Sequence, residues 1–121
     1  MPSKQDHLIQ AEHNEHFFRS FDFATTPFKD WVISGIYYCV LHHIESYLAI
    51  CNEHPQNNCQ RLACFNNHNE LDRLFVPFRT LKDASQNARY NLYQFNVGEI
   101  ESFINSQLNE IRKGIKDISP A

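Results

Sequence analysis

The sequence predicts an all-α fold, a bundle of four to five helices that run mostly up and down with short loops, in a single domain over residues 1–121. Only 3 Gly and 5 Pro occur, and 13% of the residues are aromatic, which favours helices over a turn-rich β architecture. Residues 30–55 are apolar on almost every side, so we expect them to form the central helix of the bundle. A regular apolar stripe near the C-terminus predicts a further long helix.

The first two helices are expected on either side of one loop. Residues 3–21 carry a broken apolar face and predict the first helix. Residues 24–27, ATTP, predict the loop, because proline and threonine favour a turn before a new helix. The central helix then starts at residues 28–30 and runs to about Asn52.

A third helix is expected to begin at Asn58, a plausible N-cap, and to continue to Leu74 or Phe75. Pro77 lacks the N–H that a helix interior needs, so it predicts a kink or a new first turn. The fourth helix should therefore cover residues 78–87.

An irregular aromatic link, residues 87–95, precedes the last predicted helix. Asn96 and Glu99 have the spacing of a capping box, in which each side chain satisfies the backbone amide of the other residue. The apolar stripe that follows consists of Ile100, Phe103, Ile104, Leu108, Ile111 and Ile115.

Charge and composition exclude several classes of function. A net charge of −3 gives no overall attraction to nucleic acid or anionic lipid. No run reaches the roughly 18 uncharged apolar residues of a membrane span, and the N-terminus is not a signal peptide, so we expect a cytoplasmic protein without a membrane partner. The 4 cysteines lack C-x-x-C pairing, which favours free buried thiols.

No cofactor and no metal site are predicted. The sequence has no glycine-rich phosphate loop and no G-x-S-x-G motif. His13 and His16 are spaced closely enough to share a metal. Glu12 and Glu15 flank them, so a solvated surface is the preferred interpretation.

Five short motifs follow one another between residues 11 and 90. They are A-x-x-N (Ala11, Asn14), D-W with an aromatic-tyrosine-x-x-x-His run (Asp30, Trp31, Tyr37, Tyr38, His42), E-x-Y-L (Glu45, Tyr47, Leu48), His-Pro with a downstream arginine (His54, Pro55, Arg61), and S-x-x-x-R-Y (Ser85, Arg89, Tyr90). Their order and spacing resemble those of a bacterial and archaeal HEPN domain (higher eukaryotes and prokaryotes nucleotide-binding).

The resemblance implies a metal-independent endoribonuclease whose signature is an arginine and a later histidine with four to six residues between them. Arg61 and His68 match that spacing. Residues seven apart on one helix differ by only about 20° in direction, so both should leave the same face. His68 would move the proton and Arg61 would hold the phosphate while the RNA 2′-hydroxyl attacks it. In the family, a homodimer brings two copies of the motif into one cleft.

The chain departs from the family pattern at several points. Leu62 stands where a polar residue is common, Asn58 stands where a further histidine is common, and the motif lies early in the domain. Arg61 and His68 are therefore alternatively a surface pair on a solvated or dimer-facing strip. The competing hypothesis is a non-catalytic HEPN module that binds a nucleotide or a protein partner, and a third is a purely structural dimerisation domain.

Basic residues supply the candidate RNA or nucleotide surface. The middle of the chain concentrates positive charge at Arg73, Arg79 and Lys82. Ser85, Arg89 and Tyr90, together with His54, could bind phosphate, or Arg89 could instead complement the negative end of its helix. The HEPN resemblance further implies a toxin–antitoxin or defence setting, with an antitoxin or a nucleotidyltransferase as partner.

His42 and His43 lie next to each other on the central helix, so only one of them is expected to face inward. A buried histidine would be hydrogen-bonded, with Tyr38 or Glu45 as the expected partner.

Overall fold

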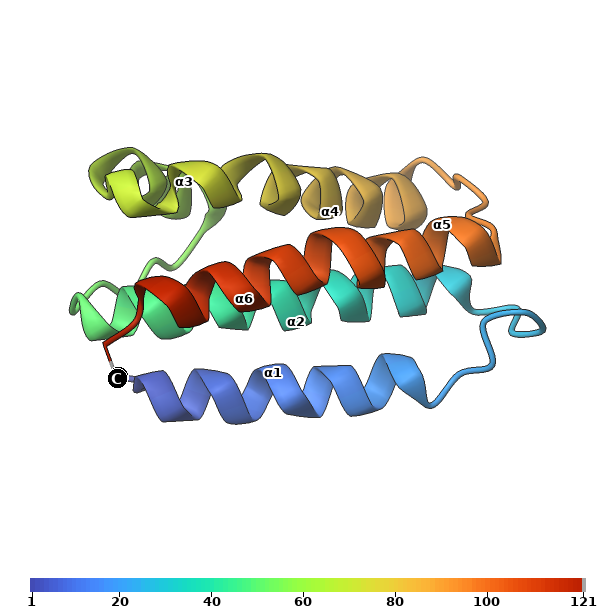
Figure 1. Ribbon diagram of the computed structural model, residues 1–121. Coiled ribbons are helices and arrows are strands. Elements are labelled where there is room, and N and C mark those ends of the chain that lie inside the picture. The colour runs from blue at the N-terminus through green and yellow to red at the C-terminus, as the bar shows by residue number, and fades with distance from the viewer. Residues whose placement is uncertain (121) are drawn as a thin grey trace.

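The computed structural model describes residues 1–120, and these form an all-α bundle, which confirms the predicted fold class (Figure 1). Successive long helices run in alternating directions, and α3 lies across one end (Figure 1). The elements are α1 (Lys4–Arg19), α2 (Lys29–Ile50), α3 (Asn58–Asn67), η1 (Asn69–Leu71), α4 (Asp72–Tyr90), α5 (Val97–Ser102), η2 (Phe103–Leu108) and α6 (Asn109–Ile118).

Helix α2 is the centre of the bundle, as its all-round apolar character predicts. Of its 22 residues, 13 are buried, so no side of it is left to solvent along its whole length. It packs against α1, α4 and α6. A Cβ at Gly35 would lie 3.0 Å from Cβ of Phe18, which shows that glycine permits the close approach of α1 and α2.

One predicted capping box and one predicted helix end can be compared with the structure. The Asn96–Glu99 box is present at the start of α5, where the Glu99 amide donates to Asn96 Oδ1 over 2.8 Å. From there α5, η2 and α6 continue as one rod, with wider turns in η2. Ser3 caps α1, which ends at Arg19, two residues before the predicted Phe21.

The third helix begins at Asn58, where the sequence predicts its start, but its predicted N-cap and its predicted end are wrong. The N-cap is Asn57, whose side chain accepts from the Gln60 amide over 2.9 Å. The helix stops at Asn67, and His68 is extended (φ −127°, ψ 99°), so α3 does not reach Leu74 or Phe75. Asparagine side chains compete for backbone hydrogen bonds, and a run of them at 66–69, broken only by His68, ends the helix here.

Pro77 does not start a new helix. It lies inside α4, which begins five residues earlier at Asp72 and extends to Tyr90, past the predicted end at 87. The proline ring is buried, so its packing offsets the missing backbone hydrogen bond. The irregular link is therefore limited to residues 91–96, and Leu92 within it has a positive φ of 56°.

Helix α2 ends in a Schellman motif that directs the chain toward α3. Asn52 has a left-handed φ of 59°. Its amide donates to Ala49 O over 3.0 Å, and the Glu53 amide donates to Leu48 O over 2.8 Å.

Two further expectations concern membranes and thiols. Within residues 1–120, no helix combines the length and the apolar character that crossing a membrane requires. Cys39 and Cys64 are buried, as expected, whereas Cys51 is half-buried and Cys59 is exposed.

Candidate functional site

Arg61 and His68 do not leave one helix face. That prediction is wrong because α3 ends at Asn67, and the extended backbone of His68 redirects its side chain. Arg61 points into the bundle toward Glu45, while His68 lies between the carboxylates of Glu53 and Glu70.

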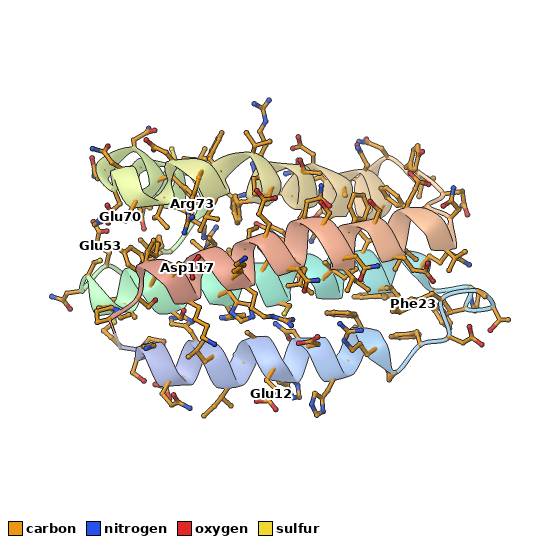
Figure 2. The ribbon with its side chains drawn as sticks, in the orientation of Figure 1. Glu12, Phe23, Glu53, Glu70, Arg73 and Asp117 are labelled. Atoms are coloured by element: carbon orange, nitrogen blue, oxygen red, sulfur yellow. The ribbon has the colours of Figure 1, made fainter. Side chains whose placement is uncertain are left out.

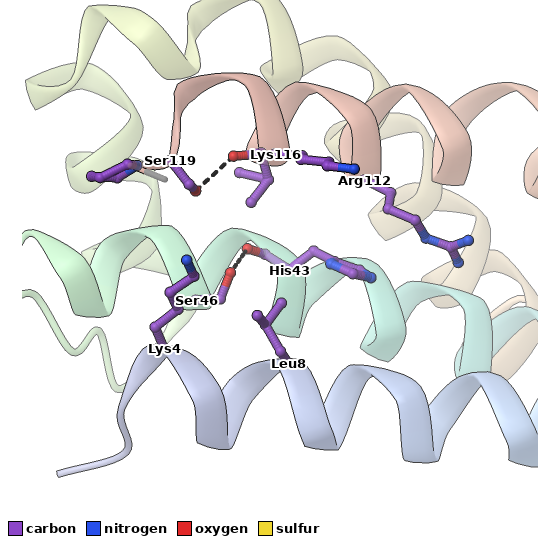
Figure 3. A pocket seen from close by; sticks show the side chains of 9 residues that line it. Lys4, Leu8, His43, Ser46, Arg112, Lys116 and Ser119 are labelled. Atoms are coloured by element: carbon purple, nitrogen blue, oxygen red, sulfur yellow. Dashed lines mark hydrogen bonds between the residues drawn. The ribbon is translucent and has the colours of Figure 1, made fainter.

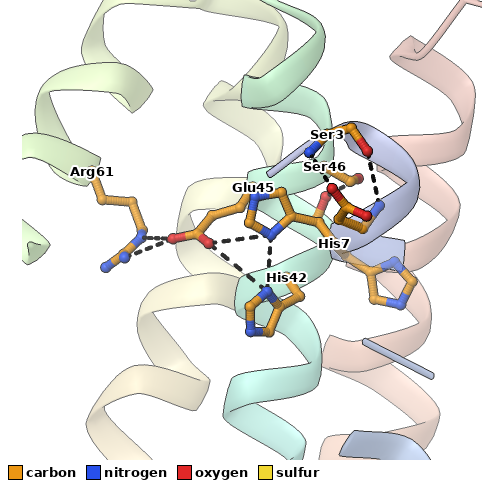
Figure 4. Close-up of polar contacts among 8 residues, drawn as sticks. Ser3, His7, His42, Glu45, Ser46 and Arg61 are labelled. Carbon is orange, nitrogen blue, oxygen red and sulfur yellow. Dashed lines mark hydrogen bonds and ion pairs between the residues drawn. The ribbon is translucent and has the colours of Figure 1, made fainter. Parts of the chain in front are cut away.

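The Arg61 guanidinium is held by two side chains. Its Nη2 and Nε donate to Glu45 Oε1 over 2.8 and 3.3 Å (Figure 4). Its Nη1 donates to Asn58 Oδ1 over 2.8 Å. Arg61 is only 8% exposed, so this is a buried ion pair between α3 and α2. All three guanidinium nitrogens donate to protein acceptors, which limits the number of N–H groups that a ligand can bind.

Arg61 forms part of the wall of a hollow between α2, the start of α3, and α4, here called the arginine hollow. Its volume is about 340 Å³. It is lined by Tyr37, Tyr38, Leu41, Gln56, Asn57, Asn58, Arg61, Lys82, Gln86 and Arg89. Three cationic side chains from two helices thus meet at one place.

Lys82 and Arg89 are the cations of this hollow that remain free to bind an anion. Among residues 1–120, neither side chain forms an ion pair with a carboxylate. Arg89 instead donates to Tyr38 Oη and to Ser85 O, each over 3.4 Å. Its guanidinium also lies 5.9 Å from the ring centre of Tyr38, which lines the hollow, and 5.0 Å from that of Tyr90, which lies outside the lining.

Two tyrosines complete the α2 side of the arginine hollow. Tyr38 is 40% exposed, so its ring is accessible from the hollow. Burial raises the pKa of Tyr37, although the positive charges of Arg61 and Arg89 act in the opposite direction. The Tyr37 phenol is therefore a neutral hydrogen-bonding group at pH 7.

Three other predicted binding residues lie elsewhere. Arg73, nine residues before Lys82, leaves α4 on the opposite side and reaches Asp117, with Nη2 3.6 Å from Oδ2 (Figure 2). Arg79 pairs with Asp83 over 3.8 Å on the exposed side of α4. Ser85 is fully buried, and its hydroxyl has no hydrogen-bond partner in the described part of the chain.

His68 lies in an acidic setting at one end of the bundle, where Figure 2 shows Glu53 and Glu70 near each other. Its Nδ1 is 3.1 Å from Glu70 Oε1, its Nε2 contacts Glu53, and the Glu70 carboxylate also accepts from Tyr47. Burial alone would lower the pKa of His68, but the hydrogen bonds and charges of Glu53 and Glu70 together raise it. The imidazole is thus biased toward its cationic form.

A second hollow, here called the histidine hollow, lies on the other side of Glu45. Its volume is about 230 Å³, and it is lined by Met1, Pro2, His7, Glu45, Glu53, His54, Pro55 and Gln56. The Nδ1 atom of His54, a predicted binding residue, is buried there without a hydrogen-bond partner among residues 1–120. His54 and Arg61 therefore belong to two different hollows.

His42 contacts Glu45, as expected, but its nearer partner is His7, whose Nδ1 lies 3.0 Å from His42 Nδ1 (Figure 4). His7 was missed from the sequence. A signal was available, because His7, Ala11 and Asn14 share one face of α1 and Ala11 is buried.

The expectation that only one of His42 and His43 turns inward is wrong, since both are partly buried on different sides of α2.

His43 faces a third hollow, which lies between α1, α2 and α6 and has a volume of about 550 Å³ (Figure 3). Burial lowers the pKa of His43 to about 4. The hollow is bordered by basic side chains from α1 and α6, namely Lys4, Arg112 and Lys116. Nothing in the sequence pattern indicates this hollow.

No family model, curated protein or solved structure matches this chain. The HEPN resemblance therefore stays a prediction.

Proposed function

We propose that this chain is an RNA- or nucleotide-binding module that holds phosphate in the arginine hollow. The observation that carries the proposal is the meeting of Lys82 and Arg89, which have no carboxylate partner among residues 1–120, with the accessible ring of Tyr38. Cations bind phosphate, and aromatic rings stack on bases. The volume of about 340 Å³ suits a single nucleotide unit, because ligand pockets span about 300–1,000 Å³.

The HEPN resemblance supports the same assignment. Three of its motifs, which are distant in sequence, converge on the arginine hollow: the tyrosine pair of α2, Arg61 after the His-Pro loop, and Arg89 near the end of α4. A toxin–antitoxin or defence setting, with an antitoxin or a nucleotidyltransferase as partner, belongs to this proposal.

Ribonuclease activity has less support. It would need His68 as a free base or acid beside the phosphate that Arg61 holds. His68 is instead paired with two carboxylates, and Arg61 is paired with Glu45 and Asn58. Binding through Lys82 and Arg89 needs no such rearrangement.

A homodimer is part of the proposal. Trp31 and Tyr38 are seven residues apart on α2, so they share a face, and they are 55% and 40% exposed. A second chain that packs on Trp31 would cover this exposed ring and border the arginine hollow. Light scattering of the wild type and of Trp31→Glu should then give the mass of a dimer and of a monomer, and a monomeric wild type contradicts the dimer.

The binding test uses fluorescence anisotropy with a labelled single-stranded RNA and, separately, a labelled adenine nucleotide. Lys82→Ala/Arg89→Ala should weaken binding at least tenfold. If both cations contact phosphate, the slope of log K against log salt for RNA should fall by about 1.4, since each contact contributes about 0.7. Arg73→Ala, on the opposite side of α4, is the matched control and should bind like the wild type.

The outcome of this test separates three cases. Binding of the nucleotide alone restricts the ligand to small molecules, and binding of RNA alone restricts it to polymers. Equal affinities for the wild type and the double variant contradict the proposal.

A further inference from the structure

The strongest grouping of metal-ligand side chains lies beside the histidine hollow. His7 comes from α1, and His42 and Glu45 come from one face of α2. One nitrogen or oxygen from each of the three residues lies within 4.8 Å of the other two. Two imidazoles and one carboxylate are ligands that zinc and similar divalent metals bind in proteins.

The spacing of these atoms matches a metal ion. The Nδ1 atoms of His7 and His42 are 3.0 Å apart. Glu45 Oε2 lies 3.5 Å from the His7 Nδ1 and 3.8 Å from the His42 Nδ1. Ligand bonds of about 2.0–2.2 Å at tetrahedral angles put neighbouring ligand atoms about 3.3–3.5 Å apart. Shifts of a few tenths of an ångström would therefore bring the three atoms to the separations found between metal ligands.

The surroundings also suit a metal. Arg61 fixes the other oxygen of Glu45 over 2.8 Å, which orients the carboxylate in the way that outer hydrogen bonds orient metal ligands. The arrangement therefore exists before any ion arrives.

We infer that His7, His42 and Glu45 form a binding site for one divalent transition metal of the zinc class. The sequence did not predict this site, and it goes beyond the proposed binding of RNA or nucleotide. Three protein ligands leave a fourth position, which would be completed by water from the histidine hollow. His54 lies in the same hollow with an unpartnered Nδ1, so it is placed to hydrogen-bond that water. The metal would tie α1 to α2 and, through Glu45 and Arg61, to α3.

The test uses the full chain after treatment with a chelator, titrated with Zn²⁺ and with Co²⁺ and with no RNA or nucleotide present. We expect one equivalent per chain, visible cobalt bands of nitrogen and oxygen ligands, and a melting temperature that rises with Zn²⁺. His7→Ala and His42→Ala should lose all three signals. Arg61→Ala, which removes the outer hydrogen bond to Glu45 but no metal ligand, should weaken binding about 10–100-fold.

His13→Ala is the matched control, because His13 is an exposed histidine of the same helix. His7→Cys keeps the inference testable even if the alanine variants fold poorly. It should still bind one Co²⁺ and should gain a near-ultraviolet thiolate band. A thiolate band in the wild type would place the metal on a cysteine. That result, no binding by the wild type, or full binding by His7→Ala overturns the inference.

Discussion

The Arg61–Glu45 ion pair separates two hollows of the bundle. Arg61 lines the arginine hollow, and Glu45 lines the histidine hollow. One carboxylate oxygen accepts from Arg61 over 2.8 Å, while the other faces His7 and His42. The Glu45 side chain of α2 therefore positions polar groups in both the arginine hollow and the histidine hollow.

Removing either partner of this pair should destabilise the fold. Glu45→Ala or Arg61→Ala leaves a buried charge without compensation, so each should lower the free energy of unfolding by about 3–5 kcal/mol. The double variant should lose much less than the sum. Urea denaturation measures this, and Arg79→Ala, which breaks an exposed pair, should change stability by less than about 1 kcal/mol. Additive losses would show that the pair is not coupled.

His43 should make stability depend on pH. Burial lowers its folded pKa from 6.5 to about 4, so between these values the unfolded chain binds more protons. Stability is therefore full above about pH 6.5 and falls as the pH drops toward 4, by up to about 3 kcal/mol from this residue. His43→Gln should flatten the dependence of unfolding free energy on pH, whereas exposed His16→Gln should not. The lowered pKa values of His7 and His42 act in the same direction.

Expression in a bacterial host tests His68 directly. We expect normal growth and intact cellular RNA for both the wild type and His68→Ala, because the imidazole is held by Glu53 and Glu70. Growth inhibition by the wild type that His68→Ala relieves would instead support the ribonuclease. Total RNA on a gel, probed after induction, distinguishes these outcomes.

Leu92 offers a stabilising substitution. Its φ of 56° is unfavourable for a residue with a Cβ, and its side chain is 76% exposed, so little packing would be lost. Leu92→Gly should raise the unfolding free energy by about 0.5 kcal/mol, since relief of about 1–2 kcal/mol of strain exceeds the extra entropy that glycine loses. Thermal melts of both variants measure the change in stability. Leu92→Ala keeps the strained backbone and should give no gain.

The sequence predicts the elements that depend on strong local patterns. The all-round apolar character of α2 and the Asn96–Glu99 box both led to correct elements, since burial and capping follow directly from the residues present. The third helix is predicted to continue past His68 because residues 66–69 are treated as helical. The polar side chains there compete with the helix for backbone hydrogen bonds.

The contents of the two hollows could not be predicted in the same way. Arg61 meets Glu45 and His7 meets His42 across separations of 16 and 35 residues, and such pairs depend on how helices pack. Arg89 and Tyr38 are likewise 51 residues apart. A pattern along one helix gives the face of a residue but not its partner.

The central position of α2 has a consequence for how the chain folds. Its most extensive contacts are with α1, which immediately precedes it in sequence, so the chain can form this antiparallel hairpin before it closes any long loop. Helical proteins dominated by such local contacts refold within about microseconds to milliseconds. Stopped-flow refolding should therefore be complete within milliseconds, and a single phase lasting seconds would mean that the later docking of α4 and α6 limits the rate.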